Sequence, residues 1–133
     1  MAKKAKVTWS ESPAAHDYPA SADYLRLLLP PGTVELLTKL LSEADSVTQK
    51  AKDILRAASL PLLGPEDSAV AKDLAKVADG HRLSPVLLVR GDLASGRPLQ
   101  IADGYHRVCA SYHLDEDTEI PCRLAAVPVA AIR

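Results

Sequence analysis

The sequence feature that most constrains the fold is the run Pro-Val-Leu-Leu-Val-Arg at residues 85–90. The run has the length of a strand, is apolar until Arg90, and is flanked by Ser-Pro on one side and Gly-Asp on the other. A strand with one solvated face alternates apolar and polar residues, whereas a strand covered on both faces is apolar throughout. The run therefore predicts a strand that is covered on both of its faces.

Three further segments predict the rest of a small mixed sheet. Residues 46–50 alternate weakly, which is typical of a short edge strand. Residues 99–102 are predicted to form a further strand, which Asp103-Gly104 breaks, and residues 120–125 another after the acidic loop at 115–119.

Helical periodicity is present in five segments. They are residues 22–29, 33–44, 51–58, a stretch that opens at Gly64-Pro65 and ends at Gly80, and 105–113. Thr33 is the expected N-cap of the second helix, with Val34, Leu37 and Leu41 on a buried stripe that Leu36 and Leu40 widen. Together with the strands, these helices predict an α+β domain.

The chain length fits a single domain. At 133 residues and 47% hydrophobic content, one core is enough. Residues 1–20 show neither helical nor strand periodicity, so we expect an N-terminal arm with Trp9 as its large apolar anchor. Residues 21–133 are expected to form the domain, in which the N-terminal helices are an extension.

Composition excludes several classes of protein. A net charge of −1 and only 4% aromatic residues argue against a nucleic-acid binder. Cys109 and Cys122 are too few for a disulfide framework and lack the spacing of a metal site. No stretch approaches the roughly 18 apolar residues of a spanning helix, so we expect a cytoplasmic protein without membrane contact.

The residues that carry chemistry are Asp103-Gly104-Tyr105-His106-Arg107, which join a strand to a helix. A helix N-terminus presents unpaired amides, and glycine lets the backbone approach an anion closely. His106 and Arg107 lie off the apolar stripe of the helix and add positive charge. The turn predicts a phosphate site, in which Asp103 is a general base, a carboxylate that binds Mg²⁺, or simply a turn acid that caps the helix.

The same segments carry a family resemblance. They are residues 70–80, 83–90 (Leu-Ser-Pro-Val-Leu-Leu-Val-Arg), 101–110 (Ile-Ala-Asp-Gly-Tyr-His-Arg-Val-Cys-Ala) and 120–123 (Ile-Pro-Cys-Arg). In this order the chain resembles the ParB/sulfiredoxin superfamily over about residues 46–125. The resemblance implies a ParB/sulfiredoxin-like fold and a nucleotide, with Mg²⁺ as an accompanying ion, as the ligand.

By this resemblance, Gly104, Tyr105, His106 and Arg107 bind phosphate, while Asp103 and His106 serve catalysis. Sulfiredoxins carry their nucleophilic cysteine just before the His-Arg pair, where this chain has Tyr105. Partition proteins continue into a helix-turn-helix and a dimerisation domain, and we do not expect their centromere-binding role here. The turn is most similar to that of the free-serine kinases of the superfamily.

The leading hypothesis is therefore a nucleotide- or phosphate-binding protein, and, if it is an enzyme, a small-molecule phosphotransferase or nucleotide hydrolase. A second hypothesis is a non-catalytic module that acts through a protein partner or as a homo-oligomer, because residues 22–58 add apolar surface beyond the resembling core. A third, a nuclease-like protein acting on DNA, fits the pI near 6.4 poorly.

Overall fold

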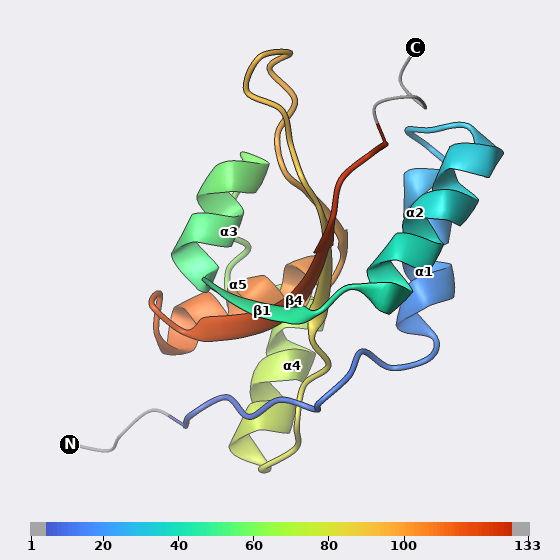
Figure 1. The fold of residues 1–133 in the computed structure, drawn as a ribbon. Coiled ribbons are helices and arrows are strands. Elements are labelled where there is room, and N and C mark those ends of the chain that lie inside the picture. Colours follow the sequence, from blue (N-terminus) through green and yellow to red (C-terminus); the bar gives the residue numbers. More distant parts are fainter. Residues whose placement is uncertain (1–4, 129–133) are drawn as a thin grey trace.

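The computed structural model describes residues 5–128, which fold into helices on both faces of one mixed sheet (Figure 1). In chain order the elements are α1 (Asp17–Leu25), α2 (Pro31–Glu43), β1 (Ser46–Lys50), α3 (Ala51–Ala58), α4 (Ser68–Ala78), β2 (Val86–Val89), β3 (Gln100–Asp103), α5 (Tyr105–Leu114) and β4 (Glu119–Ala125). The strand order is β1-β4-β2-β3, with β4 parallel to β2 and the other two pairs antiparallel. The prediction of a small mixed sheet packed by helices is confirmed.

The strand β2 is covered on both faces, as its apolar run predicts. Val86 and Leu88 belong to a core cluster built with α3, α4 and α5, whereas Leu87 and Val89 belong to a second cluster built with α1 and α2. All four side chains are buried. Alternate side chains of a strand point to opposite faces, so β2 is the centre of a three-layer packing.

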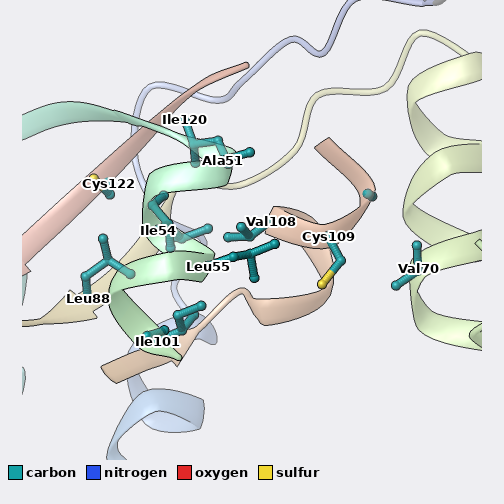
Figure 2. Packing of buried hydrophobic residues seen from close by; sticks show 13 residues of the cluster. Ala51, Ile54, Leu55, Val70, Leu88, Ile101, Val108, Cys109, Ile120 and Cys122 are labelled. Carbon is teal, nitrogen blue, oxygen red and sulfur yellow. The ribbon is translucent and has the colours of Figure 1, made fainter. Parts of the chain in front are cut away.

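The larger cluster packs α3 and α5 against the sheet. Figure 2 shows Ile54 and Leu55 of α3 close to Val108 of α5, with Ile101 of β3 beneath them. Because these side chains are buried, the cluster fixes α5 relative to the strand that precedes it.

Local sequence patterns predicted several bounds well. Both β1 and α3 have the expected residues, and β1 is an edge strand with every residue exposed. The predicted start of α4 was wrong: the helix begins at Ser68 rather than at Gly64-Pro65, because Asp67 is its N-cap and its carboxylate accepts hydrogen bonds from the amides of Ala69 (3.0 Å) and Val70 (3.1 Å). Gly80 follows that helix with φ of +81°, as expected for a C-terminal cap.

The prediction for the N-terminal segment was wrong in part. The helix α1 begins at Asp17 rather than at residue 22 and ends at Leu25 rather than at residue 29. Pro19 is tolerated because it lies in the first helical turn, where its missing amide hydrogen has no intrahelical acceptor. The arm before α1 lies on the domain, since Ser10 donates its amide to the Leu83 carbonyl at 2.9 Å.

The start of α2 also differs from the prediction. Pro31 is its first residue and no side chain caps it, so Thr33 lies inside the helix rather than at the N-cap. Proline at the first position has a φ already suited to a helix. Val34, Leu37 and Leu41 are buried as predicted, but Leu36 is 42% exposed, so the apolar face is narrower than expected.

Among the described residues, no helix is long and apolar enough to cross a bilayer.

Candidate functional site

The predicted turn joins β3 directly to α5. Gly104 has φ of +112° and ψ of 15°, in the left-handed region that favours glycine. A Cβ at this position would overlap the Val86 side chain and approach Arg107 Nη2 at 2.9 Å. Only glycine therefore allows β3 to turn into α5 this close to β2.

Arg107 lies partly buried in the centre of the site, with 13% of its side chain exposed. Its Nη2 donates to the Asp103 carboxylate at 2.5 Å, and its Nη1 donates to the Ser84 carbonyl at 2.7 Å and the Pro85 carbonyl at 3.3 Å. Nη1 also lies 3.5 Å from Oδ2 of Asp17. One guanidinium thus connects α5, β3, the segment before β2, and α1.

Asp17 is one of the residues of this site that the sequence did not reveal. It is buried at the start of α1, and its Oδ2 accepts hydrogen bonds from the Ser84 hydroxyl at 2.5 Å and the Ala14 amide at 3.1 Å. The Ser84 hydroxyl in turn accepts the Ala14 amide at 2.9 Å. Nothing in the sequence marks an aspartate at a helix start as the partner of an arginine so far along the chain.

The electrostatics of the site favour a protonatable carboxyl group. Burial raises the pKa of Asp103, the nearby charge of Arg107 opposes that shift, and the neighbouring Asp17 carboxylate adds to it. Burial also raises the pKa of Asp73 on α4, against the opposing charges of Lys76 and Arg107.

Asp103 pairs with Arg107 and does not cap α5, which has no side-chain cap. The upward shift moves the pKa of Asp103 toward the range of an effective general base.

A pocket of about 280 Å³ opens at the N-terminal end of α5. On one side, α5 and the turn contribute Gly104, His106 and Arg107, and on the other side α4 contributes Lys72, Asp73 and Lys76. His16, Asp17 and Asp103 complete the polar lining, and Ala69 of α4 adds a methyl group. The structure therefore brings four of the five turn residues to one pocket and adds two lysines that sequence reasoning had not singled out.

Tyr105 is the turn residue whose side chain does not line this pocket. Its hydroxyl donates to the Pro61 carbonyl at 2.5 Å, and its ring packs against the larger core cluster. Burial raises the pKa of Tyr105. Tyr105 can therefore contribute to the site only through its backbone amide, at the first position of α5.

The two cysteines lie in the core. Cys109 and Cys122 are both fully buried, and burial raises the pKa of Cys109 and raises that of Cys122 to about 11. The thiolate is the reactive form of cysteine. The environment of both residues therefore matches the prediction of inert core thiols.

We expect Ellman's reagent to label the native protein at least about 100-fold more slowly than the protein unfolded in urea, because the Cys122 thiolate is scarce and both sulfurs are inaccessible. The measurement is the absorbance time course with and without urea. Rapid labelling of one thiol in the native protein would contradict this packing.

No family model, curated protein or solved structure matches this chain. A function for the pocket must therefore be inferred from its own residues.

Proposed function

We propose that the pocket between α4 and α5 binds a phosphate group of a nucleotide or phosphorylated small molecule, in a domain of the ParB/sulfiredoxin type. The observation that carries the proposal is the placement of Lys72 and Lys76 across from the N-terminus of α5. Helix N-termini attract anions through their unpaired amides and dipole, and lysines add full charges to the same space.

The cations that face the pocket differ in how available they are. Within residues 5–128, the side chains of Lys72, Lys76 and His106 make no hydrogen bond or ion pair, whereas Arg107 donates to oxygens of the protein itself. The lysines and His106 are thus the groups free to contact a phosphate. Arg107 contributes its positive charge, and its contacts with Asp17, Ser84 and Asp103 fix the position of the residues around the pocket.

The size of the pocket limits what it encloses. Pockets that enclose a whole small ligand usually measure about 300–1,000 Å³. At about 280 Å³, this pocket accommodates one or two phosphate groups, and the rest of a nucleotide would lie outside it.

The carboxyl groups beside the phosphate pocket support phosphoryl transfer or nucleotide hydrolysis as its chemistry. In this scheme, Asp103 accepts the proton of the attacking hydroxyl or water, and His106 orients the phosphate. Within the described part of the chain, no three His, Cys, Asp or Glu side chains gather to hold a metal ion. Mg²⁺ would accordingly arrive with the nucleotide, on its phosphate oxygens.

A second candidate function is a non-catalytic module that binds a protein partner. The observation that favours it is the exposure of Leu27 (82%) and Leu28 (53%) just after α1. Light scattering of the purified protein that shows an oligomer, together with no nucleotide binding, would support this alternative.

The test of the phosphate site is calorimetric titration with pyrophosphate, ATP, ADP and CTP, with and without Mg²⁺. We expect the double variant Lys72→Ala, Lys76→Ala to bind about 10- to 100-fold more weakly than the wild type, because each charged hydrogen bond contributes about 1.5–3 kcal/mol before screening. Both lysines make no contact that the fold needs, so the variant should remain folded.

The matched control is Lys39→Ala, an exposed lysine on α2, which packs on the opposite face of the sheet. Equal weakening in the control would mean a general charge effect. Failure of the wild type to bind any of these compounds would overturn the proposed function.

A further inference from the structure

A second hollow lies at the other end of the central strands, between α3 and the loop from β2 to β3. It consists of two adjoining pockets, of about 710 Å³ and 350 Å³, that share Arg56, Ala57, Arg90 and Leu99. We call them the α3–loop groove. In Figure 1 the β2–β3 loop projects beyond the sheet, beside the end of α3.

The floor of the groove is apolar. Ile54 of α3, Leu88 of β2, Leu124 of β4 and Leu99 line the smaller pocket. Apolar lining with a few polar groups is the usual composition of a site for a small organic ligand.

The rim of the groove carries three arginines, of which one is free. Arg56 pairs with Asp53 at 3.3 Å and Arg97 with Asp92 at 3.6 Å, in each case within one element or loop. Among the described residues, the guanidinium of Arg90 makes no hydrogen bond or ion pair. Arg90 also lines both parts of the groove.

The acids on the rim do not neutralise Arg90. Asp92 accepts hydrogen bonds from the Ala94 amide at 3.1 Å and the Ser95 hydroxyl at 2.9 Å within its own turn. Asp53 pairs with Arg56, which lies in the last turn of α3 and offsets the negative end of that helix. The groove therefore presents a net positive charge above an apolar floor.

The sheet topology supports a binding role for this end of the molecule. Leu88 and Leu124 lie near the carboxyl ends of β2 and β4, which are parallel neighbours. Ligands of open α/β sheets commonly bind outside the carboxyl ends of parallel strands. The phosphate pocket lies instead at the opposite end of β2, beside Val86 and Gly104.

We propose that the α3–loop groove binds an organic anion with an apolar body, whose carboxylate or phosphate head pairs with Arg90 and whose hydrocarbon part lies on Leu99 and Leu124. A guanidinium binds either head group through paired hydrogen bonds. This site is independent of the phosphate pocket, because it uses different elements and different cations.

The test is calorimetric titration with butanoate, hexanoate, octanoate and octyl phosphate. We expect one saturable site whose affinity rises about fourfold for each added methylene, since each buried methylene contributes about 0.8 kcal/mol. Whichever of octanoate and octyl phosphate binds more tightly identifies the preferred head group, carboxylate or phosphate. Arg90→Glu should weaken binding by at least about 10-fold.

The matched control is Arg82→Glu, which changes an exposed arginine four residues before the start of β2, away from the groove. Both variants should stay folded, and circular dichroism checks this. Equal loss in the control, equal affinity for butanoate and octanoate, or no binding of octanoate and octyl phosphate at millimolar concentration would each overturn the proposal.

Discussion

Replacing Arg107 by alanine is expected to lower the free energy of unfolding by about 3–5 kcal/mol. The substitution leaves the buried carboxylate of Asp17 and the half-buried carboxylate of Asp103 without their cation, and it removes the donor to the Ser84 carbonyl. A domain of this size has a total stability of about 5–15 kcal/mol, so the variant should be visibly destabilised in urea. Equilibrium urea unfolding, followed by circular dichroism, measures the change.

The control for Arg107→Ala is Arg82→Ala, whose exposed side chain should contribute less than about 0.5 kcal/mol. A change below about 1 kcal/mol in Arg107→Ala would instead show that the guanidinium is available to a ligand. Because the variant is expected to disturb the fold, a loss of nucleotide binding in it would not locate the site. The lysine variants of α4 avoid that ambiguity.

Gly104→Ala is expected to cost about 2–5 kcal/mol. Two costs add up in this variant. Alanine at the positive φ of this position costs about 1–2 kcal/mol, and the overlap of its Cβ with Val86 costs about 1–3 kcal/mol. Thermal and urea unfolding measure the sum. A well-tolerated alanine would mean that β3 and α5 can move apart without loss.

Two other glycines separate these effects. Gly80 has φ of +81°, and the space that an added Cβ would occupy there is open, so Gly80→Ala reports the cost of the backbone conformation alone. Gly32 has neither feature and lies in the first turn of α2, so Gly32→Ala should be neutral or stabilise by about 0.5–1 kcal/mol. We expect Gly32→Ala to be the most stable of the three variants, Gly80→Ala to be less stable, and Gly104→Ala to be the least stable.

Local patterns predicted the parts of this fold that local chemistry determines. The apolar run of β2 predicted its burial on two faces, and the alternation at residues 46–50 predicted the edge strand β1. Gly104 predicted the turn into α5, since a positive φ and a close approach both require glycine.

The parts that were missed depend on contacts between distant segments. Asp17 is buried because the start of α1 packs beside Ser84 and Arg107, which no short-range pattern encodes. The same packing explains why α1 begins earlier than its own periodicity predicted. Lys72 and Lys76 were missed because, one helical turn apart on the same face of α4, they look in the sequence like ordinary solvated lysines. Only the arrangement of α4 against α5 makes that face a wall of the pocket.

The strand order has a consequence for biosynthesis. β4, the last strand within residues 5–128, lies between β1 and β2 and joins them into one sheet. During translation, β1 and β2 leave the ribosome early but have no common partner until residues 119–125 follow. Pairing over such sequence separations is slow to close, so the nascent chain must keep its apolar strand β2 out of contact with other chains until β4 emerges.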